Sequence, residues 1–149
     1  MKYTLLLSSV LLLTACSTPP VQIAAEAPAG NYRLDPTHAS VTWSLSHAGL
    51  SNYTARFNDI SGALTFEPTA PETSHVDIRI DPVSVSTGLP KFDEELATSR
   101  NFFDSETYPD IRFVSTSITI TGDTTGVITG DLTLKGCLLY TSPSPRDRG

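Results

Sequence analysis

The chain has 149 residues, of which 39% are hydrophobic and 17% are charged, and its formal net charge is −6. This length and composition predict one globular domain with a single core, preceded by a leader. The acidic balance and the absence of a cluster of Lys and Arg argue against a nucleic-acid partner, because such proteins neutralise phosphates with basic side chains.

The first fifteen residues have the pattern of a bacterial export signal. Lys2 supplies the positive start, and the apolar run at residues 5–13 is about half the roughly 20 residues that a membrane-spanning helix needs. The residues Leu-Thr-Ala-Cys at positions 13–16 resemble the lipobox of bacterial lipoproteins, in which the cysteine thiol is acylated before cleavage. We therefore expect a signal peptide over residues 1–15 and a lipid on Cys16; the alternative is an ordinary secretory signal with a cysteine there by chance.

The mature protein is then expected to be tethered to a membrane through the acylated Cys16 and not to span it, because two or three acyl chains hold a protein durably at a bilayer. Ser17 follows the cysteine in place of an aspartate, which indicates the outer membrane of the bacterial cell envelope, on the side that faces the periplasm. Residues 16–31 contain three prolines and no apolar period, so they predict a lipidated N-terminus and a flexible linker.

Beyond the linker, apolar and polar residues alternate, which predicts β-strands. Strands are expected at residues 32–34, 41–47, 76–80, 111–120 and 127–134, and residues 53–66 form either one long strand or a tight hairpin interrupted near residue 58. The turn sequence Thr-Gly-Asp-Thr-Thr-Gly at residues 121–126 joins the last two strands into a hairpin.

Residues 90–108 are the exception to this period of two. Phe92, Leu96 and Phe102 are spaced among acidic side chains in a way that predicts a short helix and a loop, lying across a sheet or capping one end. Many short strands with one helical insert predict an all-β fold, either an antiparallel sandwich or a barrel. The expected strands are fewer than the eight or so that small closed barrels commonly use.

The last thirteen residues differ from everything before them. The sequence from Cys137 onwards resembles the translation of a transposase-based sequencing adapter, so we expect residues 137–149 to be a non-native tail and exclude it from the fold. The alternative is a genuine polar tail. On the adapter interpretation, the natural sequence continues past Gly136 and the β-domain over residues 32–136 is incomplete at its C-terminus.

No residue pattern predicts catalysis or a metal site. The histidines lack a neighbouring nucleophile motif, and for His47 the alternative to a ligand contact is a hydrogen-bonded strand residue. The side chains of Glu94 and Glu95 point about 100° apart on a helix, which is poor geometry for a cooperating acid/base pair. We therefore expect both on a solvated face. Asp35 and His38 lack the further ligands that a metal site requires. The apolar side chains of the predicted strands and helix either fill a core or, in a barrel of about eight strands, surround one small ligand.

A series of short motifs resembles the YceI-like family of secreted polyisoprenoid-binding proteins. The motifs are Tyr-Arg-Leu-Asp-Pro-Thr-His at residues 32–38, residues 41–47 with Gly49, Phe57 with Gly62, Asp-Pro-Val-Ser-Val-Ser-Thr-Gly at 81–88, Leu96, Asn-Phe-Phe-Asp at 101–104, Tyr-Pro-Asp-Ile-Arg-Phe at 108–113 and Gly-Asp-Leu-Thr-Leu-Lys-Gly at 130–136. This resemblance covers residues 32–136 and implies a lipocalin-like antiparallel β-barrel with an apolar lumen.

The resemblance also implies that an isoprenoid-type lipid, of the quinone or prenyl phosphate class, lies in the lumen without any covalent chemistry, and that no further cofactor is needed. The hypothesis is therefore an envelope lipoprotein that binds or carries such a lipid. The candidate lumen residues are Val41, Trp43, Leu45, His47, Phe57, Leu64, Phe66, Val76, Ile78, Ile80, Phe102 and Phe113. The alternatives are a structural or stress-response envelope protein with a side-chain-filled core and, third, an enzyme.

Two features depart from the family pattern. Family members are commonly soluble periplasmic proteins, whereas this chain has a lipobox and a linker, and its last strands are expected to be missing. Because an open barrel leaves strand edges unpaired, we expect this chain to be unstable or prone to aggregate.

Overall fold

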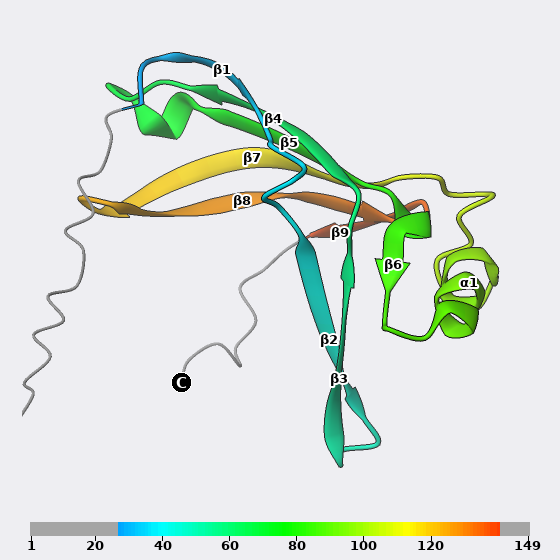
Figure 1. Ribbon diagram of the computed structural model, residues 1–149. Coiled ribbons are helices and arrows are strands. Elements are labelled where there is room, and N and C mark those ends of the chain that lie inside the picture. The colour runs from blue at the N-terminus through cyan, green and yellow to red at the C-terminus, as the bar shows by residue number, and fades with distance from the viewer. Residues whose placement is uncertain (1–26, 141–149) are drawn as a thin grey trace, which may run out of the picture.

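The structure is a computed structural model that describes residues 27–140 (Figure 1). Within these residues it contains nine β-strands and one α-helix, and the strands form two sheets. The predicted signal peptide, Cys16, residues 16–26 of the predicted linker and residues 141–149 of the predicted tail lie outside the described residues. Among residues 27–140, no helix is long and apolar enough to cross a membrane.

The larger sheet is a curved layer of six strands that runs across the upper part of the molecule in Figure 1. Its strands, in spatial order, are β1 (Gly30–Arg33), β4 (Ile60–Phe66), β5 (His75–Ile80), β7 (Ile111–Gly122), β8 (Thr125–Leu134) and β9 (Cys137–Tyr140). The smaller sheet consists of β2 (Val41–His47), β3 (Ser51–Phe57) and β6 (Val85–Ser86) in that order. All neighbouring strands are antiparallel, which confirms the predicted fold class.

The period of two predicted several of these strands well. β2 covers the residues expected of it, β5 begins one residue earlier than expected, and β7 and β8 form the hairpin predicted around residues 121–126. In the β7–β8 pair, Ser115 lies opposite Gly130 but Ser117 lies opposite Thr129, so β7 carries one extra residue there as a β-bulge. The local alternation of apolar residues was therefore sufficient to find most of the sheet.

The chain crosses from one sheet to the other at Asn58 and Asp59. β3 pairs with β2 and β6, whereas β4 pairs with β1 and β5, so the hairpin alternative for residues 53–66 is wrong. The backbone N–H groups of Asn58 and Asp59 both donate to the side-chain oxygen of Ser84, at 3.1 and 2.9 Å. The crossing is thus held by a residue far along the chain, which a local pattern does not reveal.

Both predicted boundaries of the domain differ from the structure. At the N-terminal side, residues 30–31 belong to β1 and not to the linker, because Gly30 lies opposite Phe66 and the Asn31 side chain accepts a hydrogen bond from the Thr65 hydroxyl at 3.0 Å. At the C-terminal side, β9 pairs with β8, so residues 137–140 are part of the sheet and excluding them from the fold was wrong. The adapter origin of residues 137–149 stays a prediction.

The helix α1 (Pro90–Thr98) is the predicted helical insert, and it caps one end of the molecule beside β6 (Figure 1). Pro90 starts the helix, where its missing N–H has no intrahelical partner to lose. The Asp93 carboxylate accepts hydrogen bonds from the Thr87 backbone N–H and hydroxyl at 2.7 and 2.6 Å, which fixes the helix to the segment before it. Glu94 and Glu95 are exposed, as predicted. Two 3-10 turns, η1 (Pro71–Thr73) and η2 (Pro82–Ser84), complete the regular structure of the described residues.

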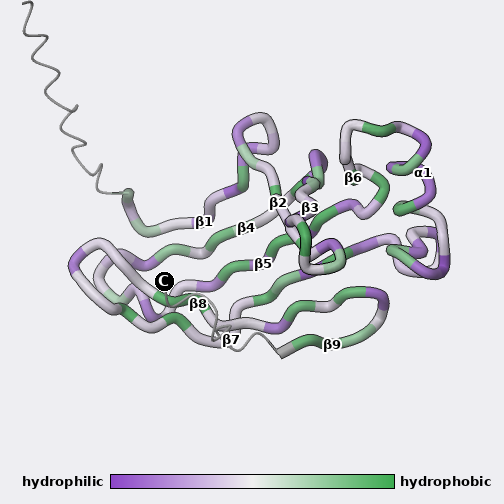
Figure 2. The backbone as a smooth tube through the Cα atoms, turned by 90° about the horizontal axis from the view of Figure 1, so that it is seen from below, coloured by the Kyte–Doolittle hydropathy of each residue, from purple (hydrophilic) through white to green (hydrophobic). Residues whose placement is uncertain are grey.

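One face of the larger sheet is apolar along its whole length. Side chains directly opposite each other in an antiparallel pair share a face. Three rows of such residues cross the sheet: Ile60, Ile80 and Ile111; Gly62, Ile78, Phe113 and Leu132; and Tyr32, Leu64 and Val76. Figure 2 shows the matching alternation of hydrophobic and hydrophilic positions along β4 and β5. The buried core lies where this face meets the smaller sheet and α1, and it consists of Phe57, Ile60, Ile80, Val85, Leu96, Ala97 and Ile111.

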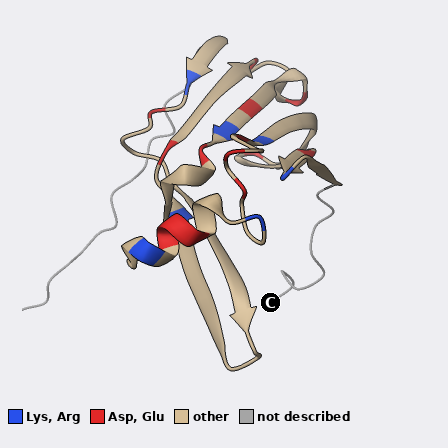
Figure 3. Ribbon diagram, turned by 90° about the vertical axis from the view of Figure 1, so that its right-hand side faces the viewer, with Lys and Arg blue, Asp and Glu red and all other residues tan. Residues whose placement is uncertain are grey.

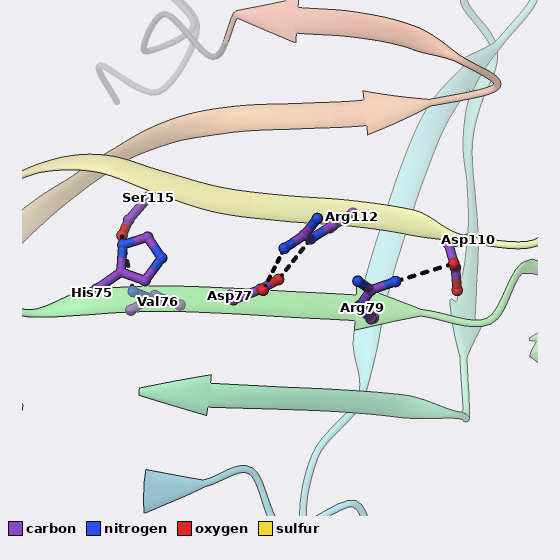
Figure 4. Close-up of polar contacts among 7 residues, drawn as sticks. All are labelled: His75, Val76, Asp77, Arg79, Asp110, Arg112 and Ser115. Atoms are coloured by element: carbon purple, nitrogen blue, oxygen red, sulfur yellow. Dashed lines mark hydrogen bonds and ion pairs between the residues drawn. The ribbon is translucent and has the colours of Figure 1, made fainter. Parts of the chain in front are cut away.

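The opposite face of the larger sheet carries ion pairs between neighbouring strands (Figure 4). Arg112 on β7 donates from Nε and Nη2 to the two carboxylate oxygens of Asp77 on β5, at 2.9 and 2.6 Å. Arg79 donates to Asp110 at 3.2 Å. The hydrogen bonds from Arg112 hold the pKa of the Asp77 carboxyl below its usual value. This polar face is the one that the sheet presents to water.

Replacing Asp77 with asparagine is expected to make stability less dependent on pH. Because the pKa of Asp77 is depressed in the folded state, the pair stabilises the protein above the unfolded pKa of about 3.9, and this contribution disappears as the pH falls through the folded value. At pH 7 the loss should be at most about 1 kcal/mol, because the pair is partly exposed. Urea unfolding at pH 7 and pH 2 measures both values, with Asp123→Asn in the exposed β7–β8 turn as control. An equal loss at both pH values would contradict the expectation.

Candidate ligand-binding cavity

A cavity of about 820 Å³ lies between the β2–β3 hairpin, α1 and one end of the larger sheet. This volume is within the range of about 300–1,000 Å³ that is usual for small-molecule sites. The cavity is lined by Val41, Trp43, Leu45, His47, Tyr53, Phe57, Ile80, Leu89, Phe92, Leu96, Phe102, Phe103, Ile111, Leu132, Leu134 and Lys135. The lining is therefore apolar and aromatic with few exceptions.

The hairpin of β2 and β3 builds one wall because alternate residues of both strands face the same way. Val41 lies opposite Phe57 and Leu45 lies opposite Tyr53, and all four side chains line the cavity. The intervening residues, such as Ser44, are exposed on the outer side of the hairpin. The alternation that forms the strands is thus also what gives the cavity its apolar wall.

A network of aromatic rings joins this wall to α1 and to the loop that follows it. The ring centroid of Phe103 lies 5.1 Å from that of Phe57 and 6.2 Å from that of Trp43, and both pairs are edge to face. The ring centroid of Phe92 in α1 lies 6.1 Å from that of Tyr53 and 6.2 Å from that of Phe102, again edge to face. Edge-to-face pairs add to the stabilisation from burial alone. The network therefore fixes the hairpin and the helix to each other on two sides of the cavity.

The polar groups of the lining offer little to a ligand. The indole Nε1 of Trp43 and the hydroxyl of Tyr53 are both buried, and neither has a hydrogen-bond partner within residues 27–140. The Lys135 amine donates to the backbone carbonyl of Arg100. His47 is exposed at the end of β2. The interior of the cavity thus suits a hydrocarbon chain better than a polar molecule.

Seven of the candidate lumen residues line this cavity and five do not. Those that line it are Val41, Trp43, Leu45, His47, Phe57, Ile80 and Phe102; those that do not are Leu64, Phe66, Val76, Ile78 and Phe113. The second group is half-buried on the same apolar face of the larger sheet but outside the cavity lining, and one of its members, Ile78, packs against the buried core. The sequence thus predicted the face, and the position of the second sheet determines which part of that face encloses a space.

Sequence reasoning missed nine lining residues, namely Tyr53, Leu89, Phe92, Leu96, Phe103, Ile111, Leu132, Leu134 and Lys135. A stricter use of the period of two would have found Tyr53 from Phe57, Ile111 from Phe113, and Leu132 with Leu134. Phe92 and Leu96 are four residues apart, which places them on one face of a helix. Leu89 and Lys135 lie in turns and have no such signal.

The described residues show no arrangement typical of catalysis. No group of three or more His, Cys, Asp or Glu side chains that could hold a metal ion occurs within residues 27–140. Asp35 and His38 form an exposed ion pair at 2.8 Å, and hydrogen bonds from Thr37 and then His38 lower the pKa of the Asp35 carboxyl. His75 is exposed at the start of β5, with its Nδ1 3.2 Å from the Ser115 hydroxyl (Figure 4). These histidines lie outside the cavity lining.

Fold and cavity together define the class: an antiparallel, lipocalin-type β-fold with an apolar cavity between its two sheets. In residues 27–140 the sheets do not close into a complete barrel, because β1 and β9 are the edges of one sheet and β2 and β6 those of the other. A family model described as the YceI-like domain matches residues 32–137. The chain therefore belongs to the YceI-like domain family, which confirms the resemblance found in the sequence motifs.

Known relatives and structures agree with this assignment. A UPF0312 protein of Pseudomonas putida is 37% identical over 115 residues, which cover 76% of this chain and 59% of the relative. The crystal structure of Burkholderia cenocepacia BcnA is similar with a TM-score of 0.64 and 25% identity, covering 72% of this chain and 66% of BcnA. The Campylobacter jejuni YCEI protein is similar with a TM-score of 0.57 and 30% identity, covering 74% and 64%. The chain thus spans about 59% of the length of the first of these relatives.

Proposed function

We propose that this protein is an envelope lipoprotein that binds or carries an isoprenoid-type lipid, of the quinone or prenyl phosphate class, in the cavity between its sheets. The observation that supports this most directly is the cavity itself, about 820 Å³ in volume and lined mainly by apolar and aromatic side chains. Membership of the YceI-like family gives the expectation of an isoprenoid. The proposed lipid on Cys16 would hold the protein at the outer membrane, facing the periplasm.

Hydrophobic burial accounts for binding without any catalytic group. A lipid chain that loses about 300 Å² of apolar surface to the cavity gains about 7 kcal/mol before the costs of ordering and association are subtracted. Such a chain needs few directed hydrogen bonds, which agrees with a lining whose Trp43 and Tyr53 polar atoms are covered. We therefore propose binding and not catalysis as the role of the site.

A side-chain-filled core is the main alternative, and it would leave the protein a structural or stress-response role. Trp43, Phe92 and Leu132 are only partly buried, and they line a space that other side chains of residues 27–140 leave empty. A filled core would bury such residues fully. The unfilled space is the specific observation that favours a ligand.

Binding is testable with the protein's own fluorescence, because Trp43 is the only tryptophan in the chain and lines the cavity. Titration of the full chain with geranylgeraniol should shift the Trp43 emission and saturate. Organic extraction of the protein purified from a bacterial envelope, followed by mass spectrometry, should recover an isoprenoid. Repeated failure to see either saturation or a bound lipid would support the filled-core alternative.

Placing a carboxylate in the cavity wall with Leu45→Glu is expected to weaken geranylgeraniol binding about tenfold, since a charge next to a bound hydrocarbon loses hydration. Leu45 is 49% exposed, so the substitution should be tolerated by the fold. Ser44→Glu is the matched control, because Ser44 is the next residue of β2 and is exposed on the opposite side. Equal affinities of the two variants, measured by Trp43 fluorescence, would show that this wall does not contact the lipid.

A further inference from the structure

The exposed fraction of the cavity lining shows where the cavity opens. Along β2, Val41 and Trp43 are half-buried, whereas Leu45 is 49% exposed and His47 is exposed as well. The other strongly exposed lining residues are Leu89, at 61%, and Phe102, at 38%, which lie on either side of α1 in the sequence. The mouth of the cavity is therefore at the end of β2, between the hairpin and α1, and its rim is apolar except for His47.

The β2–β3 hairpin extends beyond this rim. Its turn has Ala48 at φ +53° and Gly49 at φ +72°, and the Leu50 N–H donates to the His47 carbonyl at 3.0 Å. Leu50, in this turn, is 89% exposed, the highest value among the exposed large hydrophobic residues of the structure. With a rise of about 3.3 Å per strand residue, the turn lies roughly 10 Å past Leu45. The hairpin whose turn carries Leu50 thus projects away from the rest of the fold (Figure 1).

The hairpin is also free of formal charge over most of its length. Residues 41–55 contain no Asp, Glu, Lys or Arg, although these four types make up 17% of the chain. Figure 3 shows the projecting part of the hairpin without charged residues, next to an α1 that carries both signs. On α1 the exposed charges are those of Lys91, Glu94 and Glu95, and Arg100 is exposed in the loop that follows it. A protruding apolar tip without charge, beside a helix with a net negative charge, fits an uncharged or zwitterionic lipid surface better than an anionic one.

We propose that the β2–β3 hairpin tip docks on a zwitterionic lipid bilayer, with Leu50 inserted, so that the cavity mouth meets the membrane and lipid enters without crossing water. An interfacial element typically inserts about 5–10 Å, which would bring the rim residue Leu45 to the membrane surface. The inference rests on the proposed function, because it identifies the source from which the lipid in the cavity is taken. It is separate from the proposed anchor at Cys16, which uses a different part of the chain.

A probe at the hairpin tip tests the docking directly. The full chain carrying Cys16→Ser and Cys137→Ser is labelled at Leu50→Cys with a polarity-sensitive fluorophore and mixed with phosphatidylcholine vesicles. The emission should shift to the blue at position 50, and the same label at Ser61→Cys, exposed on β4, should not shift. The control matters because residues 5–13 alone can bring any labelled position near a vesicle. No shift at position 50, or equal shifts at both positions, would overturn the docking proposal.

A second measurement separates docking from lipid binding. Leu50→Asp should slow the transfer of a fluorescent isoprenoid from phosphatidylcholine vesicles to the protein by about tenfold or more, while the affinity for geranylgeraniol supplied from solvent stays unchanged. Val127→Asp is the control, because Val127 is a 48% exposed residue of β8 outside the cavity lining. Equal transfer rates for these two variants would contradict the entry route. If wild-type protein fails to bind solvent-supplied geranylgeraniol, the proposed function fails, and the label at position 50 still decides whether the tip docks.

Discussion

The variant Phe57→Ala is expected to lower the free energy of unfolding by about 3–4 kcal/mol, which is a large part of the roughly 5–15 kcal/mol that holds a typical domain folded. Phe57 is 4% exposed and belongs to the buried core. Its ring lies 5.1 Å from that of Phe103 and 6.5 Å from that of Trp43, and its backbone pairs with Val41 and Val85. Removing the ring leaves a cavity at the point where β2, β3 and β6 meet, so the neighbours cannot collapse easily.

Urea unfolding followed by circular dichroism measures this loss, with Phe102→Ala as the matched control. Phe102 is 38% exposed and contacts Phe92 at 6.2 Å, so its removal should cost only about 1 kcal/mol. The comparison uses the same chemical change at two aromatic positions of one network. Similar losses for the two variants would mean that the position of Phe57 in the core does not determine its contribution.

The variant Gly130→Ala is expected to destabilise the fold by about 2 kcal/mol, because a methyl group at this position overlaps the neighbouring strand. A Cβ atom on Gly130 would overlap the backbone oxygen of Val114 and would lie 2.5 Å from Cζ of the Phe113 ring. Cβ contacts below 3.0 Å require something to move, and a backbone oxygen in a sheet cannot move without disturbing the β7–β8 pairing. The loss should be visible as a lower midpoint in thermal unfolding.

Gly30→Ala is the control for this effect. Gly30 is also in a strand of the larger sheet, but a Cβ atom there would meet nothing within 4 Å. Its replacement should change the free energy of unfolding by less than about 0.5 kcal/mol. If the two alanine variants unfolded at the same temperature, close packing of Phe113 over Gly130 would not be the reason for glycine at this position.

Much of the fold follows from local sequence, because each strand with one buried face shows it as a period of two. Val76, Ile78 and Ile80 illustrate this: the pattern gave the strand, its face and its polar opposite side, where Asp77 and Arg79 form ion pairs. The helical insert was found from the spacing of Phe92 and Leu96 for the same reason.

The remainder depends on contacts between distant residues. The change of sheet at Asn58 depends on the Ser84 hydroxyl, and the two-residue strand β6 exists only through its pairing with Arg56 and Phe57. β9 was excluded because its sequence resembles an adapter, yet Leu138 and Leu139 pair with Thr133 and Leu132. No local pattern contains this information.

The candidate site, too, could be predicted from local sequence only in part. The apolar character of the face could be predicted residue by residue, but Leu64 and Phe113 show that membership of the face does not place a residue in the cavity. That depends on where the β2–β3 hairpin and α1 lie over the sheet, which is set by ring contacts such as Tyr53 with Phe92 and Trp43 with Phe103. Seven of the sixteen residues that line the cavity were among the candidates from the sequence, and their contact with a lipid stays a prediction.

The β-bulge in β7 affects how related sequences should be compared. Before the bulge, the odd-numbered residues Ile111 and Phe113 share the apolar face, and after it the even-numbered Ile118, opposite Ile128, takes that side. A relative whose strand lacks the extra residue would keep odd numbering throughout. Its apolar positions would then fall in different alignment columns from those of this chain unless a one-residue gap is placed at Thr116. The same parity means that deleting Thr116 would remove the bulge and keep Ile118 on the apolar face, whereas deleting two neighbouring residues there would turn the second half of the strand inside out.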